Sequence, residues 1–142
     1  GSEMCIRDRD VTLTIPSTSY NVITVGAYNG RTGSYADFSG RGYTRVIRTV
    51  KPDIVAPGVN IMSPAPGGGY SVQSGTSMAA PFVTGTAALL MQWGIVKGMD
   101  PYMYGAKIKA QLIRGAVPLR SVPVPSERAG WGALCVRKSI PD

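Results

Sequence analysis

In Gly75-Thr76-Ser77-Met78-Ala79-Ala80-Pro81, a single serine stands between a loop and an apolar segment. Residues 64–74, which precede it, are rich in proline, glycine and serine and are therefore expected to form turns. Residues 78–93, which follow it, are apolar on nearly every side of a helix, and this pattern predicts a buried helix. Pro81 is expected near the end of its first turn, where proline is tolerated. The sequence thus predicts that Ser77 lies at or beside the start of an interior helix.

A serine in this place has two interpretations. Free N–H groups at a helix start favour negative charge, and a helix held in the core keeps the hydroxyl in place. Ser77 can then act as the nucleophile of an acyl transfer while its own N–H helps to bind an oxyanion. Alternatively, Ser77 caps the helix, which is the commonest role of a serine before an apolar helix, and spacing alone favours this interpretation.

The heptapeptide, followed by Phe82-Val83-Thr84-Gly85, resembles the serine segment of the subtilisin-like serine peptidases, or subtilases. Two earlier segments match the same family in the same order, and three ordered matches argue against coincidence. The resemblance covers residues 15–90 well and the remainder loosely. The other matching segments are a core strand in Tyr20-Asn21-Val22-Ile23-Thr24-Val25-Gly26-Ala27, the strand and turn before the serine loop in Lys51-Pro52-Asp53-Ile54-Val55-Ala56-Pro57-Gly58, and the Gly-rich entry to the last helix in Gly130-Trp131-Gly132-Ala133-Leu134.

The resemblance implies a three-layer α/β fold with a mostly parallel sheet between helices. It implies that residues 10–142 are the C-terminal part of one catalytic domain whose N-terminal half is missing. The residues themselves agree, because the β-branched and apolar runs at 22–25 and 54–56 predict buried parallel strands. A second helix is expected over 106–113, with Ile108, Leu112 and Ile113 on its apolar side.

The same resemblance implies the roles of the site residues. Ser77 is the expected catalytic nucleophile and its backbone N–H an oxyanion donor, and the Thr76 hydroxyl is expected to support the oxyanion. The alternative for Thr76 is a side chain that only stabilises the loop. Phe82 stands where the best-known members carry a histidine, but that histidine is not their general base. The substrate implied is a peptide or protein, and the reaction needs no cofactor.

The sequence contains no histidine, so a Ser-His-Asp triad is incomplete in this chain. The family order places the aspartate and the histidine before the serine, and no segment upstream of Ser77 resembles either. Asn21 and Asn29 lie in the wrong segment for the family's oxyanion asparagine and are interpreted as strand-edge and turn residues. Without a neighbouring base a serine hydroxyl is a weak nucleophile. The chain as written is therefore predicted to be inactive, and the missing N-terminal half of the domain is its expected partner.

A non-catalytic relative that binds or scaffolds a peptide is the alternative function. An Asp-Ser/Thr-Gly strand end and a His-Gly-Thr-His helix start upstream would favour the enzyme, whereas substituted equivalents would favour the scaffold. Residues 1–9 match no part of the family and are expected to be a non-native tail, with a disordered native terminus as the alternative.

Other classes of function find little support. The formal charge of +7 comes from scattered basic residues without a recognition motif, which argues against nucleic-acid binding. No clustered cysteines or carboxylates predict a metal site. No signal peptide or membrane span is apparent, so localisation is open, although family resemblance is compatible with secretion or the cell surface. Cleavage preference cannot be predicted.

Three packing expectations complete the prediction. Gly85, inside the long helix, is expected to allow close packing against a neighbouring element, together with Thr84, Ala87 and Ala88. Residues 117–125 contain three prolines and are expected to form an excursion over the surface. A missing half of the domain is expected to leave an uncovered apolar surface and an unpaired strand edge.

Overall fold

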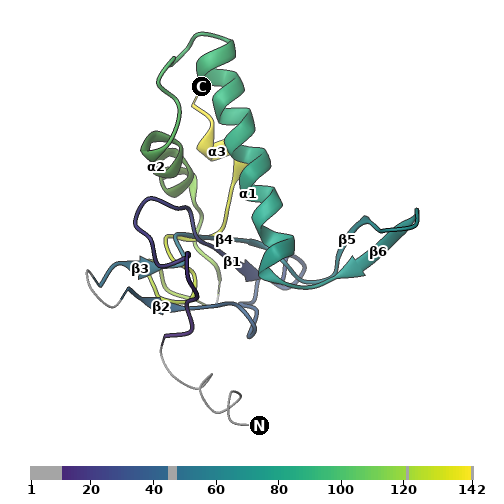
Figure 1. Ribbon diagram of the computed structural model, residues 1–142. Coiled ribbons are helices and arrows are strands. Elements are labelled where there is room, and N and C mark those ends of the chain that lie inside the picture. The colour runs from purple at the N-terminus through teal and green to yellow at the C-terminus, as the bar shows by residue number, and fades with distance from the viewer. Residues whose placement is uncertain (1–10, 45–47, 121, 142) are drawn as a thin grey trace.

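The computed structural model describes residues 11–44, 48–120 and 122–141 (Figure 1). The predicted tail at 1–9 lies outside these ranges. The strands in them are β1 (Val25–Tyr28), β2 (Gly42–Tyr43), β3 (Val50–Lys51), β4 (Ile54–Pro57), β5 (Ile61–Pro64) and β6 (Tyr70–Gln73). The helices are α1 (Thr76–Met91), its π-helical continuation η2 (Gln92–Val96), α2 (Ala106–Gly115) and α3 (Val136–Ser139).

The centre of the fold is a parallel pair of strands. β1 and β4 pair in register from Val25 opposite Ile54 to Tyr28 opposite Pro57, and Val55 forms a further parallel bridge with Ala133. β4 was predicted at its observed place, but β1 begins at Val25, whereas the prediction was 22–25. The backbone just ahead of it is held by a side chain, because the N–H of Thr24 donates to the Asp53 carboxylate at 2.8 Å.

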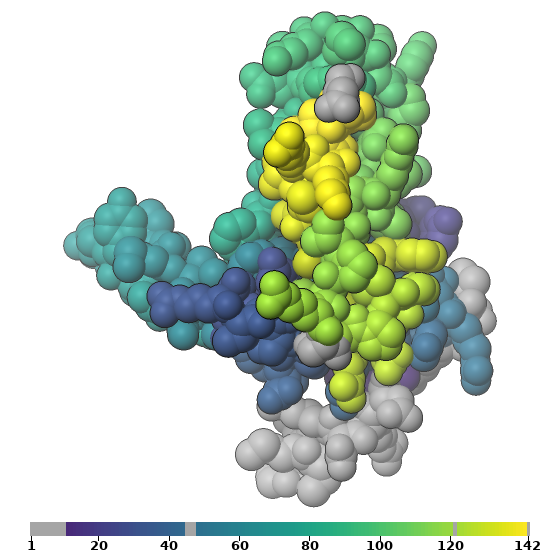
Figure 2. All heavy atoms as spheres, turned by 180° about the vertical axis from the view of Figure 1, so that it is seen from behind, coloured from purple at the N-terminus to yellow at the C-terminus, as the bar shows by residue number. Residues whose placement is uncertain are grey.

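The serine loop predicted at 64–74 is mostly a β-hairpin. β5 and β6 are antiparallel, with Met62 opposite Val72 and Pro64 opposite Tyr70. Strand structure resumes at Tyr70, as the turn formers before it suggest. Figures 1 and 2 show this hairpin standing away from the body of the molecule, so the chain returns from an exposed arm directly into α1.

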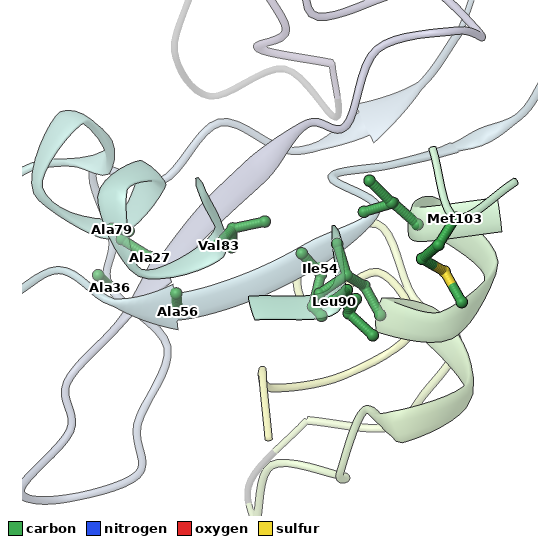
Figure 3. Close-up of a cluster of buried hydrophobic side chains, with 10 residues drawn as sticks. Ala27, Ala36, Ile54, Ala56, Ala79, Val83, Leu90 and Met103 are labelled. Atoms are coloured by element: carbon green, nitrogen blue, oxygen red, sulfur yellow. The ribbon is translucent and has the colours of Figure 1, made fainter. Parts of the chain in front are cut away.

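A core cluster fills the space between α1 and the parallel strands (Figure 3). Ala27, Ala56 and Ala79 lie at the end of the cluster nearest the start of α1, and all three are fully buried. Their small side chains allow the first turns of the helix to lie close to the strands. Larger side chains, among them Leu90 and Met103, fill the far end, where α1 meets the segment before α2.

A second cluster lies on the opposite face of β4, around Val55. It contains Leu119 and Val122, both buried, and these two residues also form a β-bridge with each other. The prediction of a surface excursion over 117–125 holds for the three prolines, which are exposed, but is wrong for Leu119 and Val122. Its prolines end regular structure, but the apolar residues between them cover the sheet.

The prediction of a wholly buried serine helix was also wrong for the described part of the chain. Only Ala79, Val83, Thr86 and Leu90 of α1 are buried, because one side of the helix meets the strands. By length and composition alone, Thr76–Val96 could cross a membrane, with a mean hydropathy of 1.3. Its packing on β1 and β4 indicates instead a core helix that is covered on one side.

The other side of α1 is uncovered in the described chain. Phe82 and Leu89 lie seven residues apart, on one side of the helix, and are 43% and 44% exposed; we refer to these two residues as the open face of α1. Gly85 is exposed and a Cβ there would meet no atom within 4 Å. The predicted close packing at Gly85 is therefore absent among the described residues, whereas the predicted uncovered apolar surface is confirmed.

Ion pairs join Asp53, the residue before β4, to Lys51 and to Lys109 of α2. The Nζ of Lys51 and the Nζ of Lys109 lie 2.7 and 2.9 Å from the two carboxylate oxygens of Asp53. Lys51 is fully buried, and both ammonium groups also donate to the carbonyl of Val22. Burial lowers the pKa of Lys51 below its ordinary value, although the neighbouring Asp53 opposes this shift.

Candidate active site

The start of α1 presents Ser77 to solvent. The helix begins at Thr76, the capping position is taken by Gly75, and no side-chain hydrogen bond caps the helix. Ser77 is the second helical residue and is exposed. The prediction that it lies beside the helix start is confirmed, and the alternative that it is the capping residue is wrong, since glycine fills that position without a side chain.

The first turn of α1 suits a developing negative charge. A residue in the first turn has no carbonyl one turn earlier in the helix to pair with its N–H, so the amides of Thr76 and Ser77 have no helical acceptor. The first turn contains no acidic residue, and no charged residue lies between Asp53 and Lys97 in the sequence. The helix dipole therefore acts at Ser77 without a competing carboxylate from its own segment.

Pro81 is the sixth residue of α1 and lies in its second turn, whereas it was predicted near the end of the first. Helical geometry would pair the N–H of residue 81 with the carbonyl of Ser77, and proline has no N–H. The Ser77 carbonyl therefore lacks its usual helical donor. The missing hydrogen bond therefore affects the backbone of Ser77 itself.

Thr76 lines a cavity of about 690 Å³ beside the helix start. Five further serine and threonine residues line it, together with one acidic and one basic residue. Thr76 is half-buried, whereas Ser77 stands exposed next to this cavity and is not part of its wall. The remaining lining residues are Val11, Thr12, Leu13, Thr14, Ser17, Thr24, Val25, Asp37, Phe38, Ser39, Gly40 and Arg41.

Residues 37–41 form part of this wall, and sequence reasoning missed them. Asp37 and Phe38 are exposed, whereas Ser39 is buried and its hydroxyl accepts a hydrogen bond from the N–H of Ala27 at 2.9 Å. The Tyr35 hydroxyl donates to the Ser39 carbonyl, and burial raises the pKa of Tyr35. The loop is thus fastened to β1. No local sequence pattern could have found it, because its partners lie across the fold.

Asn21 and Asn29 are not among the residues that line the cavity. Asn29 forms a turn in which its side-chain oxygen accepts from the N–H of Arg31 at 3.0 Å, as its interpretation as a turn residue implies. Among the described residues, no group of three histidine, cysteine or carboxylate side chains is placed to hold a metal ion. The site can present a hydroxyl and bind an anion, but the sequence offers it no imidazole.

Comparison with known proteins gives a consistent result. The family model for the subtilase family matches residues 5–132, a range that begins inside the segment expected to be a foreign tail. The intracellular serine protease of Paenibacillus polymyxa is 36% identical over 116 residues, which cover 82% of this chain and 33% of that protein. The minor extracellular protease Vpr of Bacillus subtilis strain 168 is 40% identical over 114 residues, or 74% of this chain and 13% of that protein.

Solved structures agree with these matches. The CspB protease of Clostridium perfringens superposes with a TM-score of 0.84 and 45% identity, over 90% of this chain and 27% of that chain. The self-cleaved protease domain of PatA superposes with a TM-score of 0.70 and 33% identity, over 89% of this chain and 43% of that chain.

These relatives bear out the fold expected from the sequence. The chain has an α/β subtilisin-like fold, and it spans a third or less of the length of the two curated relatives described. The matching segments include the serine loop and the helix that follows it. This chain belongs to the subtilase family of serine proteases.

Proposed function

We propose that this chain carries the nucleophile of a serine endopeptidase domain and that Ser77 forms the acyl-enzyme. The observation that carries the proposal is the exposed Ser77 at the second position of a helix whose cap is already occupied by Gly75. Its hydroxyl is not needed for capping, and the helix beneath it is anchored to two buried strands. A hydroxyl held in this way meets the geometric need of a nucleophile.

The oxyanion is stabilised by groups of the same turn. The N–H of Ser77 is one donor, since it has no helical acceptor and lies at the positive end of the helix dipole. The Thr76 hydroxyl is the second group that we assign to oxyanion support, because it lies at the helix start and on the wall of the adjacent cavity. That cavity receives part of the peptide or protein substrate.

The reaction follows the serine-protease sequence. The Ser77 hydroxyl attacks a peptide carbonyl, a histidine takes its proton and returns it to the leaving amine, and water then releases the acyl group. The sequence contains no histidine, so this polypeptide by itself is expected to lack peptidase activity. An N-terminal region of the same domain, which contributes the aspartate and the histidine, is the partner that the proposal requires.

The alternative is a subtilase-like protein that binds or scaffolds a peptide without cleaving it. An exposed Ser77 within an intact serine motif favours the enzyme, because a scaffold does not need a hydroxyl free at this position. The two functions differ in a single outcome, which is whether a bound peptide is hydrolysed.

The test is to complete the domain. The N-terminal catalytic region of a related subtilase, such as the CspB protease, is joined to this chain, and hydrolysis of a peptide library is followed by mass spectrometry. We expect cleavage by the completed domain, no cleavage by either part alone, and loss of cleavage in Ser77→Ala. Ser19→Ala, which alters another exposed serine, serves as the control and retains activity. Peptide binding without cleavage in the completed domain would support the scaffold instead.

A further inference from the structure

The turn after β4 touches the loop that leads into Ser77. Gly58 follows β4 directly, and its carbonyl accepts a hydrogen bond from the N–H of Gly75 at 2.8 Å. The N–H of Gly58 donates to the carbonyl of Tyr28 in β1 at 3.0 Å. A second bond, from the N–H of Asn60 to the Ser74 Oγ at 2.8 Å, joins the same two segments. Gly58 therefore lies between the central strands and the serine loop.

This contact leaves no room for a side chain. A Cβ at Gly58 would lie 2.7 Å from the Cβ of Ala27, 2.8 Å from the carbonyl oxygen of Gly75 and 3.3 Å from the Cβ of Ala79. Gly58 does not have a left-handed backbone conformation. The glycine is therefore required for close approach and not for its conformational freedom.

The peptide of Gly75 transmits the contact to the helix. Its N–H is bonded to Gly58, and its carbonyl accepts the N–H of Met78 in the first turn of α1 at 3.1 Å. Gly75 is also the capping residue, two positions before Ser77. A displacement of the Gly75 carbonyl therefore displaces the turn that carries the Ser77 hydroxyl and amide.

We propose that Gly58 is a positioning residue for Ser77, which it holds in reacting geometry through the Gly75 peptide. The proposal rests on the nucleophile role proposed for Ser77. Displacements of about 1 Å at a reacting group lower rates by about 100-fold, so contacts of this kind act on kcat. The role is distinct from packing, because one side of Gly58 faces the core at Ala27 and the other faces the serine loop at Gly75.

The two sides can be separated by mutation in the completed domain. Gly58→Ala overlaps with both Ala27 and Gly75, whereas Gly58→Ala combined with Ala27→Gly removes the closest overlap in the core and keeps the overlap with Gly75. We expect Gly58→Ala to lower both thermal stability and kcat. Relative to Ala27→Gly alone, the double variant should lose less stability than Gly58→Ala loses relative to the wild type, but it should keep a kcat about 10- to 100-fold lower, with KM unchanged.

Gly94→Ala is the matched control. A Cβ there would lie 2.4 Å from the Cβ of Met103 and 2.7 Å from the carbonyl oxygen of Asp100, at the opposite end of the serine helix. It introduces an equally tight overlap in η2 without touching the serine loop. Gly94→Ala should therefore lower stability while kcat, measured well below its unfolding temperature, is retained.

The outcomes separate a failure of the positioning role of Gly58 from a failure of the nucleophile role of Ser77. Recovery of kcat together with stability in the double variant would overturn the positioning role and leave Gly58 as a packing residue. If Gly58→Ala does not fold, Ser74→Ala tests the same junction by removing only the bond from Asn60, and an unchanged kcat would overturn the proposal. If Ser77→Ala itself keeps full activity, the nucleophile assignment fails, whatever the Gly58 variants do.

Discussion

Glycine at the cap explains why Ser77 is free to react. A serine at position 75 would cap the helix, but Gly75 leaves that role without a side chain, and Ser77 projects from the turn that follows. The sequence motif locates Ser77 and Thr76 correctly because the determinants of a helix start are local. The wall formed by Phe38 and Ser39 could not be predicted in this way, since its contacts with β1 join residues far apart in sequence.

Asp53 is the buried carboxylate that balances the charges of its lysine neighbours. It forms ion pairs with Lys51 and Lys109 and accepts a hydrogen bond from the N–H of Thr24. Asp53→Asn would leave two ammonium groups facing a neutral amide and should lower the free energy of unfolding by about 3–5 kcal/mol. Lys51→Met should lower it by less, because Asp53 keeps Lys109. Urea unfolding of the two variants beside the wild type measures both effects, and an equal loss in both would contradict this account.

The stability contribution of Lys51 should depend on pH. Burial lowers its pKa in the folded state below the ordinary value of 10.5, so the folded chain releases this proton at a lower pH than the unfolded chain. Between the folded pKa and 10.5 the unfolded state binds more protons, and the free energy of unfolding therefore rises with pH. The difference in unfolding free energy between the wild type and Lys51→Met should shift in favour of the wild type as pH rises towards 10.5. A difference that falls with pH would contradict the direction of this shift.

At the scale of elements, two adjacent leucines in α1 show which side of the helix packs against the strands. Leu90 is fully buried, whereas Leu89 belongs to the open face. Leu90→Ala should lower the free energy of unfolding by about 2–5 kcal/mol, and Leu89→Ala by less than about 1 kcal/mol. Chemical denaturation of the two variants compares them directly. Similar losses would mean that the open face is covered by an element that the described residues do not include.

The burial of the same helix could be predicted only in part from the sequence. An all-round apolar pattern predicted burial on every side, and the four buried side chains of α1 confirm it on one side only. The pattern shows which side chains are apolar, whereas burial depends on the elements that pack against α1, and the described residues cover it on one side. The β4 strand and the α2 helix were predicted well, because each has its own periodicity and its own end signals. Residues 117–125 were not, because proline content predicts irregular backbone and says nothing about burial.

At the scale of the whole molecule, the open face of α1 and the exposed hairpin predict association. Apolar patches of this kind are unusual on soluble monomers. The chain alone should therefore self-associate as its concentration rises, which sedimentation velocity can detect. Leu89→Lys should reduce this association because it places a charge on the open face, whereas Ile15→Lys, at a residue that is 90% exposed but does not belong to the open face, should not. Equal effects of both variants would show that added charge acts without regard to position.

The distribution of charge supports the same view of the molecule. No charged residue lies between Asp53 and Lys97, a range that includes β4, the hairpin and α1. The basic residues lie instead in the segments before and after it, and Lys109 reaches back to bind Asp53. The net charge of +7 therefore comes from the segments before and after the serine segment.

The central claim is that Ser77 is the reacting group, and the position of a covalent adduct tests it most directly. The completed domain is treated with a serine-directed phosphonate, digested, and mapped by tandem mass spectrometry. We expect a single adduct on Ser77, none in Ser77→Ala, and none on this chain when it is treated alone. An adduct on another residue, or equal labelling of the wild type and Ser77→Ala, would contradict the account.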